Sequence, residues 1–135
     1  MENDGTVAPP ADEIAPQRSQ IWLRAVSAIG LGIIAFASAW AGVLPFAGLV
    51  LAVALLMSWE WSRVVRGEGI DIALIVHGLA VTAAAALAAF GFAALGVAAL
   101  VIGTIIVLAL QFGERPILSA AGVLYAGLPA VALLW

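Results

Sequence analysis

Glu60 is the first residue whose position suggests chemistry, because it interrupts an apolar region as the centre of "WEW". A carboxylate inside a membrane is costly to bury and usually marks a functional site. Trp59 and Trp61, however, are typical of the boundary between lipid and water, which places Glu60 at headgroup depth. Arg63 follows three residues later, at the spacing of a helical ion pair. We therefore expect an interfacial ion pair rather than a catalytic acid.

His77 is the single histidine of the chain and could relay protons or bind a metal. A metal site needs several ligands, and the chain has no second histidine and no cysteine. A hydrogen bond from His77 to a neighbouring helix is the favoured interpretation. Thr104 and Gln111 are interpreted in the same way, as polar contacts between helices. Asp71 is explained by the start of a helix, where a carboxylate faces the positive end of the helix dipole.

The remaining short motifs carry little chemistry. Gly30 and Gly32 form a GxG pattern, but no strand precedes them and no third glycine follows in register, so they are no nucleotide fingerprint. Glu114 and Arg115 are explained by a surface turn. The residues alone therefore leave catalytic and cofactor-binding residues unknown and predict no metal site.

The composition indicates which elements must position these residues. Hydrophobic residues make up 65% of the 135 and charged residues only 10%, which is far from the balance of a soluble domain. The chain has no lysine, which excludes a polybasic surface for nucleic acid or anionic lipid. We predict an all-α fold, a polytopic integral membrane bundle of about five transmembrane helices. The expected spans are residues 23–41, 45–64, 70–90, 93–112 and 117 to the end, separated by "WAGVLPF", a charged loop at "EWSRVVRGEGID", "FGF" and "GERP".

Small residues at four-residue spacing suggest where these helices touch. Gly78, Thr82 and Ala86 form one such stripe, Ala85 and Ala89 a second, and Ala28 and Gly32 a third. Stripes of this kind let helix backbones approach closely in lipid. The alternative, that alanine-rich helices produce such spacings by chance, stays open.

Three short segments, in this order along the chain, carry a resemblance to a known family. They are an Arg-x-x-Ser-Ala pattern (Arg24, Ser27, Ala28), a Trp-Glu-Trp segment (Trp59, Glu60, Trp61) and a Leu-Tyr-x-Gly-Leu-Pro segment (Leu124, Tyr125, Gly127, Leu128, Pro129). Over residues 20–135 the chain thereby resembles bacterial phosphatidate cytidylyltransferases, the CDP-diacylglycerol synthases. The resemblance implies CTP and phosphatidate as substrates, Mg²⁺ as cofactor, membrane lipid as surroundings and a bacterial inner membrane as location, and it leaves a homodimer open.

The chain departs from this family in one large respect. The family's catalytic signature, Pro-Gly-His-Gly-Gly and then Asp-Arg-x-Asp, is absent, so no catalytic residue and no Mg²⁺ ligand is carried over. We therefore expect a cytoplasmic disordered tail over residues 1–19 and, over residues 20–135, the N-terminal transmembrane region of such an enzyme, truncated before its catalytic half and inactive alone. Truncation would also explain an apolar end, "LYAGLPAVALLW". The alternative is a small non-enzymatic membrane protein that acts through helix contacts.

The arginines predict how the chain crosses the membrane. All five lie at the N-terminal side of the first span, between the second and third spans, or between the fourth and fifth, whereas the first and third connections carry no charge. Since positive residues stay in the cytoplasm, the N-terminus is predicted to be cytoplasmic. A reporter fused after Phe90 should be active in the periplasm, and one fused after Arg115 in the cytoplasm. The reverse pattern of reporter activity would contradict this orientation.

Overall fold

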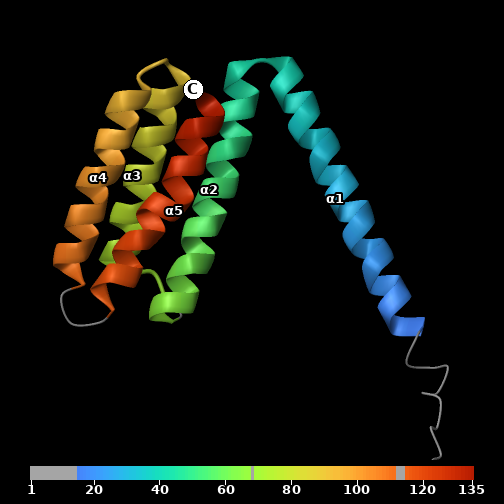
Figure 1. Ribbon diagram of the computed structural model, residues 1–135, viewed down its shortest axis with the longest axis horizontal. Helices are drawn as coiled ribbons and strands as arrows, with labels where there is room; N and C mark the ends of the chain where they lie inside the picture. The colour runs from blue at the N-terminus through green and yellow to red at the C-terminus, as the bar shows by residue number, and fades with distance from the viewer. Residues whose placement is uncertain (1–14, 68, 112–114) are drawn as a thin grey trace, which may run out of the picture. The chain divides into compact units, whose positions relative to one another are not determined.

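The computed structural model describes residues 15–67, 69–111 and 115–135, and these residues form five α-helices and no strand (Figure 1). The helices are α1 (Ala15–Ala41), α2 (Val43–Arg66), α3 (Ile72–Ala89), α4 (Ala93–Leu110) and α5 (Pro116–Leu134). Each is long and apolar enough to cross a membrane. The all-α fold class and the five predicted spans are confirmed.

The chain divides into two compact units, residues 1–37 and residues 38–135. The described part of the first unit is most of α1, which carries no charge after Arg24 and exposes large apolar side chains, as suits a helix in lipid. Within it, the Ser27 hydroxyl donates to the Leu23 carbonyl at 2.6 Å, so this polar group is satisfied by its own helix. Residues 1–14 lie outside the described residues, and the tail over residues 1–19 stays a prediction.

The second unit contains a bundle of α2, α3, α4 and α5 (Figure 1). Successive helices run in opposite directions, so α3 and α5 are parallel to one another. These two helices are central, because each contacts the other three, whereas α2 and α4 do not touch within the described residues. The core is made of alanines and of a few larger side chains that are fully buried, namely Val81, Leu100, Val107 and Val123.

Glycine and alanine set the distance between the central helices and α4. A Cβ added to Gly96 would lie 2.8 Å from the Ala84 carbonyl oxygen, and one added to Gly103 would overlap the Cβ of Ala80. Close backbone approach of this kind is what small residues permit in lipid. The face of α3 that is buried holds Ala73, His77, Ala80, Val81, Ala84, Ala85 and Ala88.

The predicted stripe of Gly78, Thr82 and Ala86 lies beside this buried face, and only its Gly78 end faces another helix, near Leu55 of α2. Ala86 is exposed, and Gly78 and Thr82 are only partly buried. The second stripe is half right, since Ala85 is buried and Ala89 is partly exposed. The error has a simple cause, because small residues occur on every side of α3 and spacing cannot distinguish one side from another.

The charged connection is shorter than predicted, because α2 continues through Glu60 and Arg63 to Arg66. Gly67 then ends the helix with φ +95°, and its N–H donates to the Arg63 carbonyl at 3.1 Å. A positive φ of this size is disfavoured for other residues, which makes glycine the natural stop. The predicted span of residues 45–64 is thus two residues short at its C-terminal end, and the charged segment "EWSRVVRGEGID" is a loop only after Arg66, since charge alone does not end a helix.

The described arginines of the bundle gather at one end. Arg63 and Arg66 close α2 and Arg115 precedes α5, whereas the Gly91 turn and Trp135 lie at the opposite end (Figure 1). This arrangement is the spatial counterpart of the one-sided arginine distribution in the sequence.

The close contact between α3 and α4 can be tested with Gly103→Ala. Because the new methyl group would overlap Ala80, whose own Cβ cannot rotate away, the helices must separate, and we expect a loss of about 1–3 kcal/mol of unfolding free energy. Gly48→Ala is the matched control, since it adds the same methyl group in α2 where nothing lies within 4 Å. Unfolding of both variants in detergent gives the comparison, and equal stability of the two would contradict the packing described here.

Candidate functional site

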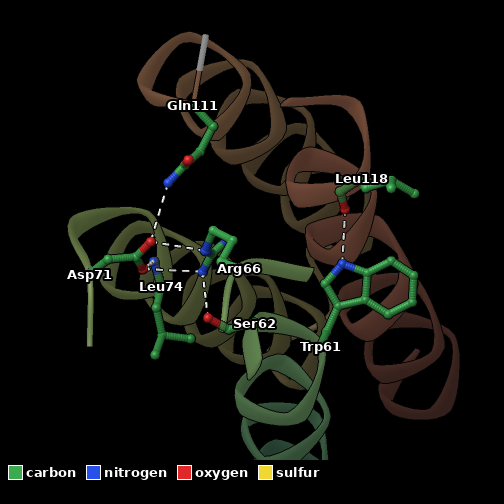
Figure 2. Close-up of polar contacts among 7 residues, drawn as sticks. All are labelled: Trp61, Ser62, Arg66, Asp71, Leu74, Gln111 and Leu118. Carbon is green, nitrogen blue, oxygen red and sulfur yellow. Dashed lines mark hydrogen bonds and ion pairs between the residues drawn. The ribbon is translucent and has the colours of Figure 1, made fainter. Parts of the chain in front are cut away.

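Asp71 is the centre of a polar cluster at the arginine-bearing end of the bundle (Figure 2). It is the N-cap of α3, and its Oδ1 accepts a hydrogen bond from the Leu74 backbone N–H at 2.7 Å. The same carboxylate forms an ion pair with Arg66, whose Nε lies 2.9 Å from Oδ2. The Asp71 carboxylate thus accepts a hydrogen bond from the first turn of α3 and also balances the positive charge of Arg66.

Arg66 is the buried member of this pair, with a side chain only 7% exposed. Its NH2 group donates to the Ser62 hydroxyl at 2.7 Å and to Asp71 Oδ1 at 3.2 Å. Neither Nε nor NH1 meets the geometry of a hydrogen bond to any described residue. Nε is nevertheless paired with Asp71 Oδ2 in the ion pair, so NH1 is the group of this side chain that has no acceptor among the described residues.

Gln111 brings a third helix into the cluster. It caps the C-terminal end of α4, and its Nε2 donates to Asp71 Oδ2 at 3.2 Å. The Asp71 carboxylate therefore links the end of α2, the start of α3 and the end of α4. Its two oxygens receive four contacts in all, from Leu74, Arg66 and Gln111.

Trp61 joins α2 to α5 one turn away from this cluster. Its indole N–H donates to the Leu118 carbonyl at 2.9 Å, and its ring lies 4.9 Å from that of Tyr125 at an interplanar angle of 32° (Figure 2 shows the hydrogen bond). The indole fits because Gly122 has no side chain, since an added Cβ would overlap the ring. The predicted interfacial Trp61 is thus also a contact between helices.

His77 and Ser119 are buried polar residues deeper in the bundle, both with no exposed surface. His77 lies beside the Gly122 backbone and near Arg66, but neither of its ring nitrogens meets hydrogen-bond geometry within the described chain. The Ser119 hydroxyl also has no partner among the described residues. Together with Arg66, these two residues hold every buried unsatisfied side-chain atom found in the described chain.

A pocket of about 220 Å³ opens beside the ion pair. It is lined by Ser62, Arg66, Gly67, Gly69, Ile70 and Asp71. Gly67 and Gly69 both have positive φ, and nothing lies within 4 Å of a Cβ built on either. The pocket therefore lies directly beside the buried Arg66 side chain.

The described residues do not fit the Mg²⁺ that the family resemblance implies. They contain no group of three histidine, cysteine or acidic side chains that could hold a metal ion. Among the described residues Asp71 is the carboxylate that lines the pocket, and both of its oxygens are already occupied by N–H donors. We therefore assign no step of any reaction to a metal bound by these residues.

The structure decides most of the sequence-based interpretations of single residues. Asp71 as the start of a helix and Gln111 as a contact between helices are confirmed. Thr104 as such a contact is wrong, because its hydroxyl donates to the Leu100 carbonyl of its own helix at 2.7 Å. His77 lies beside Gly122 of α5, as expected for a contact with a neighbouring helix, and its hydrogen bond to that helix stays a prediction. Glu60 is exposed, and its ion pair with Arg63 stays a prediction.

Arg66 and Ser62 are the site residues that the sequence analysis missed. The signal was present, because Ser62 and Arg66 are four residues apart and share one face of a helix. Its use required knowing that α2 extends to Arg66, which the predicted loop obscured.

Comparison with protein families gives one finding of function. A family model described as the cytidylyltransferase family matches residues 22–135. The chain belongs to the cytidylyltransferase family. No curated protein and no solved structure matches the chain significantly.

Membership in the cytidylyltransferase family supports nucleotidyl transfer as the general function, and the five apolar helices fit a multi-pass membrane protein. Two of the segments on which the sequence resemblance depends also meet in space. Trp61 of the Trp-Glu-Trp segment stacks on Tyr125 of the Leu-Tyr-x-Gly-Leu-Pro segment. The part of the matched region that lies in the second unit, from α2 to α5, is therefore one packed bundle.

The two roles of Asp71 can be separated by two substitutions. Asp71→Asn keeps an N-cap side chain but loses the ion pair, whereas Asp71→Ala loses both, so we expect the alanine variant to be less stable by about 1 kcal/mol more. Both should be less stable than the unmodified protein, because each leaves Arg66 buried without its carboxylate. Unfolding in detergent measures the difference, with Glu60→Gln as the control at an exposed carboxylate. Equal stability of the Asp71 and Glu60 variants would refute the assigned roles.

Proposed function

We propose that this chain is the membrane-embedded part of a phosphatidate cytidylyltransferase, which converts CTP and phosphatidate into CDP-diacylglycerol and pyrophosphate. The observation that carries the proposal is the family match over residues 22–135 in a chain made of membrane-spanning helices. A cytidylyltransferase needs a nucleotide and an acceptor. An enzyme whose matched region lies in the bilayer is best placed to use an acceptor that is itself a lipid.

The proposed reaction is a substitution at phosphorus. A phosphate oxygen of phosphatidate attacks the α-phosphorus of CTP, and the bond from that phosphorus to the bridging oxygen of the β-phosphate breaks, so that pyrophosphate leaves with the electron pair. Catalysis of phosphoryl transfer consists largely of positioning the groups and stabilising their negative charge. The acceptor phosphate lies at headgroup depth, so an enzyme of this kind needs cationic groups where a helix reaches the membrane surface.

The described arginines supply such groups at one end of the bundle. Arg66 is held in one orientation by Ser62 and Asp71, and Arg63 and Arg115 belong to the same end. This end faces the cytoplasm in the predicted orientation, where CTP is available. The helices would therefore hold the lipid acceptor beside the nucleotide, while the groups that act on the triphosphate lie in the signature that the chain does not contain.

The activity test follows radiolabel from the α-phosphate of CTP into lipid, in membranes that lack their own synthase. We expect no labelled CDP-diacylglycerol from the 135-residue chain alone, because its carboxylates form no cluster in the described residues that could face a triphosphate. When the chain is joined to a segment that carries the Pro-Gly-His-Gly-Gly signature, label should enter lipid if phosphatidate is supplied. Diacylglycerol in place of phosphatidate is the matched control.

Two outcomes would contradict the proposal. Turnover by the chain alone would show that the catalytic groups lie within it. Failure of every joined form that inserts in the membrane would instead favour the alternative, a non-enzymatic membrane protein that acts through helix contacts.

A further inference from the structure

His77 and Ser119 are polar side chains with no exposed surface that neither the packing nor the proposed function uses. Both ring nitrogens of His77 and the Ser119 hydroxyl oxygen are buried, and none of the three has a hydrogen-bond partner within the described residues. Buried polar atoms in native proteins are almost always hydrogen-bonded, so each exception calls for an ordered water, an ion or a ligand. These two residues therefore mark a polar site inside the bundle.

The Ser119 hydroxyl differs from the other hydroxyl groups of the bundle. Ser58, Thr82 and Thr104 each donate at 2.7 Å to the carbonyl four residues earlier in their own helix. The corresponding carbonyl for Ser119 is that of Arg115, which accepts the Ser119 backbone N–H at 3.1 Å but not its hydroxyl. A helical serine that does not bond its own backbone leaves its hydroxyl available to a neighbour. Because Ser119 is fully buried, that neighbour lies inside the bundle.

The helix that Ser119 faces is α3, at the level of His77. On α5, Ser119 lies between Gly122, which packs against α2, and Val123, which packs against α4. The helix between these two neighbours is α3, which contacts α2, α4 and α5. His77 of α3 lies beside the Gly122 backbone, one turn from Ser119. Two polar groups without partners thus meet at one contact between helices.

The number of hydrogen-bonding atoms favours water as the missing partner. The Gly122 backbone can serve at most one of the two ring nitrogens of His77, which leaves the other nitrogen and the Ser119 hydroxyl. A water molecule has two donors and two acceptors, so it can bond both groups at once. A metal ion would need further ligands, and the described residues contain no group of three that could supply them.

Water has only a short distance to travel to this position. Ser119 is the fourth residue of α5 and His77 the sixth of α3, and both helices begin at the arginine-bearing end of the bundle. At the rise of an α-helix the two residues lie about 5 Å and about 8 Å from the starts of their helices. The polar site is therefore close to the membrane surface and not at the centre of the apolar layer.

We propose that His77 and Ser119 bind a buried water molecule between α3 and α5. This water is a polar link between two helices whose other contacts are made mainly by small apolar side chains. The inference does not depend on the proposed function, because it rests only on side chains of the bundle.

The test is radiolytic hydroxyl labelling of the full 135-residue chain in lipid nanodiscs, with the oxidised residues identified by mass spectrometry. A buried side chain is oxidised in this experiment when a bound water lies next to it. His77 is the single histidine of the chain, so histidine products report on this site alone. We expect His77 to be labelled, and Leu100, which is fully buried in the apolar core, to stay unlabelled.

Ser119→Ala should remove most of the His77 labelling, because the water loses one of its two side-chain partners. It should also raise the unfolding equilibrium constant in detergent about fivefold, the effect of one lost hydrogen bond. Ser58→Ala is the matched control, since Ser58 is also buried but its hydroxyl donates to the Ala54 carbonyl of its own helix. This variant should leave the labelling of His77 unchanged.

Three results would overturn the proposal. One is an unlabelled His77 in the unmodified protein, and another is labelling that persists unchanged in Ser119→Ala. The third is a lower unfolding constant in Ser119→Ala, which would show that the hydroxyl was dry and without a partner. A direct bond between His77 and Ser119 would give destabilisation without labelling, so the two measurements together distinguish it from a bound water.

Discussion

Close backbone approach is the constraint on which the bundle of this cytidylyltransferase-family chain depends. In lipid the helices gain nothing from hiding apolar side chains, because the surrounding tails are equally apolar. What remains is packing between helices, and it is strongest where the side chains are smallest. Gly96, Gly103 and Gly127 each lie against another helix so tightly that a Cβ would find no room. Larger side chains such as Leu100 then fill the space that the glycines leave.

The polar cluster at the end of the bundle depends on this packing. Asp71 reaches Arg66 and Gln111 only because α2, α3 and α4 end at the same level, and α3 is drawn against α4 by its small residues. The ion pair in turn fixes the connection between α2 and α3. A few polar contacts therefore fix how the helices are aligned along their axes. Their apolar surfaces alone would leave this alignment poorly defined.

The sequence predicts the number and approximate bounds of the helices well, because a stretch of apolar residues long enough to cross a bilayer has few other structures open to it. It also predicts Asp71 as a helix start and Gln111 as a polar contact, since each has only a few ways to satisfy its hydrogen bonds.

The sequence does not predict which face of α3 points inward. Alanine occurs on all sides of that helix, so no contrast between polar and apolar positions marks the buried face. The pairing of Arg66 with Asp71 is equally hidden, because it requires a turn through glycines with positive φ that brings two helix ends together. Thr104 illustrates a third limit, since a hydroxyl in a helix can bond its own backbone as readily as a neighbour.

The central position of α5 has a consequence for how the protein is made. Helices enter the membrane in chain order, and α5 follows the three helices that it contacts. Until it arrives, Trp61 has no access to the Leu118 carbonyl 57 residues further along, and the side of His77 that later meets Gly122 faces lipid or another protein. The chain without α5 thus lacks the acceptor of the Trp61 indole and the helix that covers His77. The bundle can therefore be completed only after α5 has been synthesised.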